Sequence, residues 1–370
     1  GDVEAFARMG AYESLLHGVG LVWDHYYHRG SVARALLGTA LSGVVAPTLQ
    51  DIDGPGVATC DAQLDATAEL ADSDYFAAHG VFAALGPHAT DTVSEGLWSR
   101  AAARAREVGL PVHPHVAQSI EEVRFSLERR GRPPMTWLVT AGLLDDLPAT
   151  VFAHCIYVSR DELALLDPAR DCRVFCPHRQ RVFGFPADPL AWSEGDLRWA
   201  TATDCSPSND SMNLQKELRY LAGQRTMSTT WSQPYRRFLD RADTEDAERA
   251  WEARGAAFAR ASADTTAQRL LDRVWHVPGG LHPAFTAGNL APGTLANLVV
   301  WDDDHPSFWP APGLGTLAMG DTTQAIHAMW VAGREVGRAG DFHRSLVDSD
   351  AYRDALAEAE GRRRRIVSGD

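Results

Sequence analysis

Short apolar runs alternate with amphipathic segments over the first two-thirds of the chain. The runs that we expect to form strands are 20–22, 81–85, 110–112, 150–153, 173–175 and 197–201. Apolar residues recur with helical spacing in the segments between them, such as 94–108, 120–130 and 160–166. Strands that alternate with helices in this way predict parallel βαβ units, and hence an α/β fold.

Polar residues gather just after the predicted strands. The residues concerned are His25, His88, His113, His154, His178 and Asp204. One histidine after a strand is an ordinary structural feature, but a repeated pattern is harder to assign to packing alone. In a parallel (β/α)₈ barrel the carboxyl ends of the strands converge on one face, where active sites are built. The sequence therefore predicts a TIM barrel with a polar mouth.

The pattern changes after residue 204. Residues 209–221 and most of 222–275 have the composition of helices. Two β-rich runs, 296–301 and 325–331, fall outside the βα alternation and predict a small separate β-layer. We divide the chain into a barrel over 1–285, β-sandwich strands over 286–342 and a C-terminal helix over 343–370.

Composition narrows the class of protein. The 370 residues are 45% hydrophobic and carry a net charge of −14, with no basic stripe that could bind nucleic acid. The one basic run, 362–365, is interpreted as a solvated helix end. No apolar run approaches a membrane span of about 20 residues, and the N-terminus lacks a signal-peptide pattern. The five cysteines form no disulfide framework and are interpreted as buried small hydrophobes, so a cytoplasmic location is expected.

Four residues could hold or surround a metal ion. His113 and His115 alternate along one predicted strand and could share a face. Asp204 closes a buried strand, which is costly unless the carboxylate binds a cation or is well hydrogen-bonded. With His154, these residue types suit Zn²⁺ or Fe²⁺, and an Asp beside a metal-bound water could accept its proton. We predict His115 and Asp204 as ligands.

Further candidates have weaker support. Arg179 follows a predicted strand and could bind an anionic or carbonyl-bearing substrate, although a solvated loop fits equally well. Trp23 could stack on a planar ring or belong to the core. Cys205 lies beside Asp204, but no histidine partner is implied, so a buried packing role is favoured over a nucleophile.

Short motifs follow one another along the chain: Gly86-Pro87-His88-Ala89, His113-x-His115, His154-Cys155, Cys176-Pro177, Thr203-Asp204, Ser208-Asn209, Glu217-Leu218-Arg219, Pro292-Gly293 and Ala332-Gly333-Arg334. In these motifs the chain resembles the amidohydrolase superfamily, in the branch of atrazine chlorohydrolase, methylthioadenosine/adenosylhomocysteine deaminase and guanine deaminase. The order is kept over nearly the whole chain. The resemblance thus identifies the family but does not identify the substrate.

The resemblance implies roles for individual residues. His115 corresponds to a metal ligand, His154 to a residue that contacts substrate or the hydrolytic water, and Asp204 to a ligand and proton acceptor. His88 and Asn209 correspond to positions that shape the pocket. The implied cofactor is one divalent metal, zinc in preference to iron, and the implied partner is a small heterocyclic substrate. Assembly as a homodimer is left as a possibility.

Two departures from the family pattern bear on function. The family's proton-shuttling glutamate would stand at position 118, where this chain has Gln118, an amide that cannot titrate. The family's first His-x-His pair has no counterpart, so we expect a segment upstream of Gly1; His25 and His28 are the only nearby pair.

We predict hydrolysis of a C–N bond, by ring opening of a cyclic amide or by deamination. The alternative is a relative that binds a small ligand without catalysis.

Overall fold

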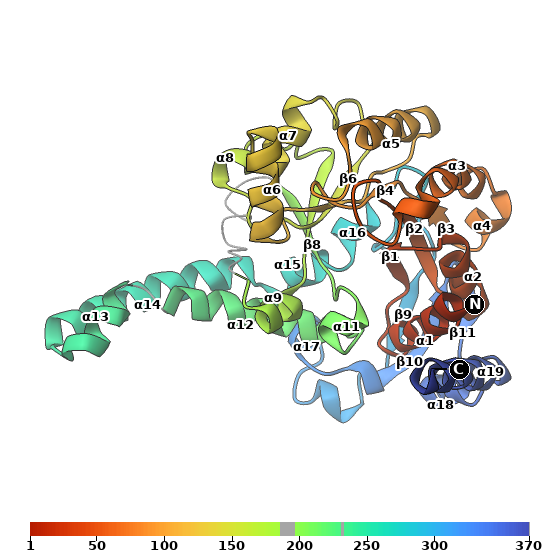
Figure 1. Ribbon diagram of the computed structural model, residues 1–370. Coiled ribbons are helices and arrows are strands. Elements are labelled where there is room, and N and C mark those ends of the chain that lie inside the picture. Colours follow the sequence, from red (N-terminus) through yellow and green to blue (C-terminus); the bar gives the residue numbers. More distant parts are fainter. Residues whose placement is uncertain (186–196, 231–232, 370) are drawn as a thin grey trace.

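The computed structural model describes residues 1–185, 197–230 and 233–369 (Figure 1). Eight strands form two sheets in which every pairing is parallel. The first half-sheet contains β1 (Leu21–Tyr26), β2 (Ser42–Leu49), β3 (Val81–Ala83) and β4 (Gly86–Pro87). The second half-sheet contains β5 (His115–Val116), β6 (Thr150–His154), β7 (Asp171–Phe175) and β8 (Arg198–Thr201). Bridges from Val112 to Leu85 and to Thr150 join the halves, which confirms the predicted parallel βαβ units.

Helices alternate with these strands along the chain. They are α1 (Asp2–Leu16), α2 (Arg29–Thr39), α3 (Cys60–Ala71), α4 (Asp74–Ala78), α5 (Glu95–Val108), α6 (Ile120–Arg130), α7 (Pro134–Thr140), α8 (Arg160–Leu163) and α9 (Pro177–Phe183). The side chains of Ser94 and Ser119 accept hydrogen bonds from the first turns of α5 and α6, and Gly109 and Gly131 end these helices in the left-handed conformation. The predicted helix boundaries of both are therefore confirmed, because the capping residues are visible in the sequence.

The sequence-based prediction missed strand β2. All eight of its residues are buried, as expected for a strand covered on both faces. Gly43 and Pro47 look like breakers in the sequence. A Cβ on Gly43 would lie 2.6 Å from Leu36 Cδ1, so glycine lets α2 pack closely on this strand.

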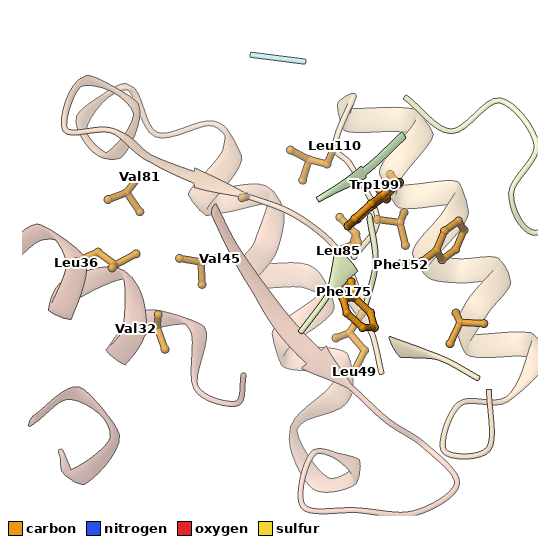
Figure 2. Packing of buried hydrophobic residues seen from close by; sticks show 14 of the residues in the cluster. Val32, Leu36, Val45, Leu49, Val81, Leu85, Leu110, Phe152, Phe175 and Trp199 are labelled. Carbon is orange, nitrogen blue, oxygen red and sulfur yellow. The ribbon is translucent and has the colours of Figure 1, made fainter. Parts of the chain in front are cut away.

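One large apolar core stabilises the parallel sheet and its helices. Figure 2 shows Val32 and Leu36 of α2 beside Val45 of β2. The same cluster continues to the second half-sheet through residues that include Leu85, Leu110, Phe152, Phe175 and Trp199 (Figure 2). The core thus spans both half-sheets and holds their strand ends in fixed relative positions.

A separate antiparallel sheet follows the barrel. Its order is β11 (Arg334–Val336), β10 (Ile326–Val331) and β9 (Leu298–Trp301), which confirms the predicted β-layer. Within the described residues this layer is a single sheet, and the proposed domain boundaries stay a prediction. Helices α18 (Phe342–Val347) and α19 (Asp350–Ser368) follow it. Helix α19 packs on α1, where Arg362 pairs with Asp2 at 2.8 Å, so the basic run is not simply a solvated helix end.

The segment after β8 is helical, as predicted. Helices α12 (Leu214–Thr230), α13 (Gln233–Arg241) and α14 (Thr244–Asp264) pack on one another and project from the barrel as an arm (Figure 1). The shorter helices α11 (Ser206–Asn209), α15 (Ala267–Asp272), α16 (His276–Gly279) and α17 (Leu314–Met319) lie nearer the barrel (Figure 1). Across the described residues, no helix has the length and apolar character that crossing a membrane requires.

Candidate active site at the carboxyl ends of the strands

A cavity of about 260 Å³ opens at the carboxyl ends of the parallel strands. Its lining includes Asp24, His25, His113, His115, His154 and Asp204. These side chains come from β1, from β5 and the segment leading to it, from the end of β6 and from the segment after β8. The predicted polar mouth is therefore formed by residues far apart in the sequence.

Four histidines form a contiguous cluster around this cavity. The ring of His115 lies 4.5 Å from that of His25, 5.0 Å from that of His88 and 5.1 Å from that of His154. Burial, reinforced by the neighbouring imidazoles, lowers the pKa of His25 and of His115 well below the ordinary value. These rings are therefore neutral at physiological pH, the form in which imidazole binds metal ions.

Backbone carbonyls fix the tautomers of two histidines. The Nδ1 of His25 donates to the carbonyl of His113 at 2.7 Å, and the Nδ1 of His113 donates to the carbonyl of Val151 at 2.6 Å. Among the described residues, the Nε2 of His25 and the Nδ1 atoms of His115 and His154 are buried without a hydrogen-bond partner. Buried polar nitrogens without partners are costly, and a bound cation would satisfy several of them. The donor set of the mouth thus fits a metal ion.

The carboxylate of Asp204 is paired with the guanidinium of Arg179. Its Oδ2 forms an ion pair with Arg179, and its Oδ1 accepts a hydrogen bond from the backbone N–H of Cys205 at 2.7 Å. Arg179 is buried, and its guanidinium stacks on the ring of Phe183. The solvated-loop reading of Arg179 is therefore wrong; its role toward substrate stays a prediction.

A compact set of possible ligands surrounds the same carboxylate. One ligand atom each from His154, Cys176 and Asp204 lies within 4.8 Å of the other two. Burial raises the pKa of the Cys176 thiol well above its usual range, with Asp204 acting in the same direction. His115 stacks on His154 but is not in this compact set. Sequence reasoning missed Cys176 because burial alone was a sufficient account of it.

The backbone is strained at these strand ends. Ala117, His154, Cys155 and Asp204 have φ values of 49°, 74°, 50° and 63°, in the left-handed region that side chains with a Cβ rarely adopt. Such residues concentrate at active sites, where the surrounding structure holds them. The strain follows β5, β6 and β8, so it marks the same mouth as the polar side chains.

Gln118 lies on the loop after β5, above a buried carboxyl group. The backbone N–H of Gln118 donates to Glu122 Oε2 at 2.8 Å, and the Thr90 hydroxyl donates to Glu122 Oε1 at 2.7 Å. Burial raises the pKa of Glu122 to about 7, although these hydrogen bonds oppose the rise. Glu122 therefore anchors the loop that presents Gln118, a role that the sequence did not reveal.

The other predicted site residues have different surroundings. His88 donates to or accepts from Thr92 Oγ1 at 2.8 Å beside the histidine cluster. Asn209, the last residue of α11, donates to the Thr203 carbonyl and, at 2.8 Å, to Glu217 Oε1, so it ties the segment after β8 to α12. Trp23 lines the cavity and also packs on the core. The buried packing role expected for Cys205 is wrong, because this residue precedes α11 at an exposed turn.

A parallel βα array with imidazoles and a carboxylate at its carboxyl ends is the arrangement of a TIM-barrel enzyme site. The family model described as "Amidohydrolase family" matches residues 1–233, and the chain belongs to this family. The predicted fold class is thereby confirmed.

Individual relatives are more distant. The chain is 25% identical over 229 residues to a 5'-deoxyadenosine deaminase of Methanococcus maripaludis, a match of 60% of this chain and 52% of the relative. It is 28% identical over 319 residues to a 5-methylthioadenosine/S-adenosylhomocysteine deaminase of Halobacterium salinarum, covering 84% of this chain and 64% of the relative. The match to the first of these relatives spans about half of its length.

Solved structures share the fold. A zinc-bound adenosine deaminase of Xanthomonas campestris superposes with a TM-score of 0.79 at 20% identity, covering 99% of this chain and 75% of the other. Atrazine chlorohydrolase of Arthrobacter aurescens, complexed with zinc, gives a TM-score of 0.73 at 17% identity, covering 97% and 76%. At these identities the likeness establishes the barrel architecture.

Proposed function

We propose that this protein is a metal-dependent amidohydrolase that hydrolyses a C–N bond of a small N-heterocycle. The observation that carries the proposal is the convergence of His115, His154 and Asp204 on one cavity at the carboxyl ends of parallel strands. Relatives named as deaminases of 5'-deoxyadenosine and of methylthioadenosine or adenosylhomocysteine support a purine-like substrate.

The proposed cofactor is one divalent metal, zinc in preference to iron, with His115 and Asp204 among the candidate ligands. When bound, such an ion lowers the pKa of its water and supplies a nucleophile at neutral pH. Asp204 would accept the proton of that water, since its carboxylate lies at the cavity. His154 would hold the water or the substrate by a hydrogen bond, because its neutral imidazole lies beside both His115 and Asp204.

The side chain of Gln118 bears on the choice between the two proposed reactions, ring opening and deamination. An amide can orient a substrate or a water, but it cannot shuttle a proton to a leaving amine. This favours ring opening of a cyclic amide, in which the leaving nitrogen stays attached to the product. The names of the relatives favour deamination. His88, Asn209, Trp23 and Arg179 remain the proposed substrate-binding residues, and assembly as a homodimer stays a prediction.

A substrate panel tests the proposal. Zinc-loaded protein would be incubated with aminopurine nucleosides, with guanine and with five- and six-membered cyclic amides, and ammonia and new carboxylate would both be measured. We expect turnover of one class, lost on chelation and restored by zinc. Stoichiometric zinc without turnover of any compound would overturn the proposal and leave the ligand-binding alternative.

A further inference from the structure

Helix α12 places a buried glutamate against the segments that follow β7 and β8. Glu217 is 0% exposed and lies in the first turn of α12, which packs on α9, and α9 in turn packs on α11. The residues that precede these two short helices, Cys176 and Cys205, both line the cavity. The glutamate is therefore in contact with two segments that border the candidate site.

Both carboxylate oxygens of Glu217 accept hydrogen bonds. Its Oε2 accepts the backbone N–H of His178 at 2.9 Å, and its Oε1 accepts from Nδ2 of Asn209 at 2.8 Å. Burial raises the pKa of Glu217 to about 7, and these two hydrogen bonds oppose the rise. Hydrogen bonds in a buried network are strong because the local dielectric is low. The glutamate thus ties the start of α9 to the end of α11.

The two contacts lead to Asp204 from two sides. Nδ2 of Asn209 also donates to the carbonyl of Thr203, the residue directly before Asp204. His178 directly precedes Arg179, whose guanidinium is paired with the Asp204 carboxylate. Asp204 itself has a φ of 63°, a conformation that its surroundings must hold. The buried glutamate therefore restrains both the backbone that carries this aspartate and the helix start that carries its partner.

We propose that Glu217 is a positioning residue for Asp204, and that it fixes the direction of the aspartate through Asn209 and the start of α9. The inference rests on the proposed function, in which Asp204 accepts the proton of the hydrolytic water. Glu217 lies outside the lining of the cavity and acts only through its partners. Glutamine is a poor substitute here. A carboxylate accepts from two donors, whereas an amide offers one oxygen and an NH₂ group that would face the second donor.

A second buried glutamate supplies a matched control. Glu162 is 3% exposed and accepts the backbone N–H groups of Met135 and Thr136, each at 3.2 Å. It therefore also holds a helix start in place, but neither partner lines the cavity. Glu162→Gln and Glu217→Gln make the same chemical change at similarly buried positions. Urea unfolding should show a similar loss of stability in both, so a difference in metal binding or turnover reports the link to the site.

Zinc affinity provides the first readout, because Asp204 is a candidate ligand. Measured against a chromophoric chelator, zinc binding by Glu217→Gln should weaken by about 10-fold or more, the scale of an outer-shell change, while Glu162→Gln should match the wild type. At saturating zinc, kcat of Glu217→Gln should fall by about 10-fold with KM nearly unchanged, since Glu217 touches no substrate. Equal zinc affinity and equal kcat in the two glutamine variants would overturn the proposal.

Asn209→Ala tests the same link from its other end, and it keeps the proposal testable if Glu217→Gln does not fold. Its zinc binding should also weaken, and the effects of the two changes should be less than additive in the double variant, because they share one hydrogen bond. Full additivity would overturn the proposal. The two levels of inference are separable. Weakened zinc binding in these variants without turnover by the wild type would remove only the hydrolase activity, whereas wild-type turnover that Glu217→Gln leaves unchanged would remove only the positioning role.

Discussion

Two aspartates at the mouth of the barrel have contrasting environments. Asp204, after β8 in the second half-sheet, is paired with Arg179 and lies beside His154 and Cys176. Asp24, on β1 in the first half-sheet, is half-buried, and its Oδ1 is buried with no hydrogen-bond partner in the described structure. Burial alone raises the pKa of Asp24 to about 7. The same residue type is thus paired with a cationic side chain in one half, and in the other it is an acid whose pKa burial raises toward neutrality.

The comparison assigns different tasks to the two half-sheets. The second half supplies a group of donors that could hold a metal, and strained backbone at His154 and Asp204 fixes their directions. The first half supplies His25 and His88, whose Nδ1 atoms are already engaged with protein oxygens. We infer that the second half-sheet carries the metal chemistry and that the first half-sheet shapes and supports the cavity.

The largest expected effect follows from Asp204→Asn. Replacing the carboxylate by an amide removes both a proposed charged ligand and the proposed proton acceptor, so turnover should fall by about 10³-fold, the scale expected for loss of a key charge-stabilising group. Bound zinc, measured by elemental analysis, should fall in parallel. Asp210→Asn is the matched control, since Asp210 is an exposed helix-end residue only six positions away. Unchanged zinc content in Asp204→Asn would break the comparison.

Asp24→Asn tests the other half of the comparison through stability. The folded-state pKa of Asp24 is about 7, and the ordinary value is 3.8. Between these values the folded state retains a proton that the unfolded state has lost, so the free energy of unfolding declines as pH rises from about 4 to about 7. At about 1.4 kcal/mol per pKa unit, the variant should gain on the order of 4 kcal/mol at pH 8 and little near pH 4.

Urea unfolding of both proteins across this pH range measures the difference. Asp53→Asn, at an exposed position, controls for a simple change in net charge. A stability difference between wild type and Asp24→Asn that does not vary with pH would show that Asp24 is ionised in the folded protein, and the contrast with Asp204 would disappear.

The sequence predicted those parts of the site that depend on local pattern. The apolar runs before His154 and Asp204 identify strand ends, and parallel topology is sufficient to bring such ends together. The capped helices α5 and α6 were predictable for the same local reason. These features need no knowledge of which strand lies beside which.

The features that sequence missed depend on packing and register. Strand β2 contains Gly43 because helix α2 packs closely on it at that position. Cys176 becomes a candidate ligand only through the alignment of β7 with β6 and β8. The Arg179–Asp204 pair likewise joins a helix start to a strand end 25 positions later. A single sequence contains no signal for such distances.

Gln118 is expected to have a smaller effect than Asp204. If its amide orients water or substrate, Gln118→Ala should lower turnover by about 10²-fold, because one positioned hydrogen bond is lost, while zinc content stays nearly intact. Gln118→Glu restores a titratable group at the family's proton-shuttle position. For a ring-opening enzyme the new carboxylate should slow the reaction, and for an impaired deaminase it should increase ammonia release. Steady-state rates on the substrate panel distinguish these outcomes; loss of zinc from Gln118→Ala would contradict the assigned role.

The smallest expected effect comes from His25, the first-half residue nearest to the metal chemistry. Its Nδ1 is held by the carbonyl of His113, and its ring lies 4.5 Å from that of His115. As a support for His115, it should contribute on the scale of an outer-shell residue, so His25→Gln should lower turnover by about 10-fold. Zinc stoichiometry should persist, because the candidate ligands His115 and Asp204 are intact. His28→Gln, at the exposed start of α2, controls for changes in the same loop. If His25→Gln instead released the metal as completely as Asp204→Asn, the buried Nε2 of His25 would have to be a ligand. The metal centre would then span both half-sheets, and the division of tasks drawn from the two aspartates would have to be abandoned.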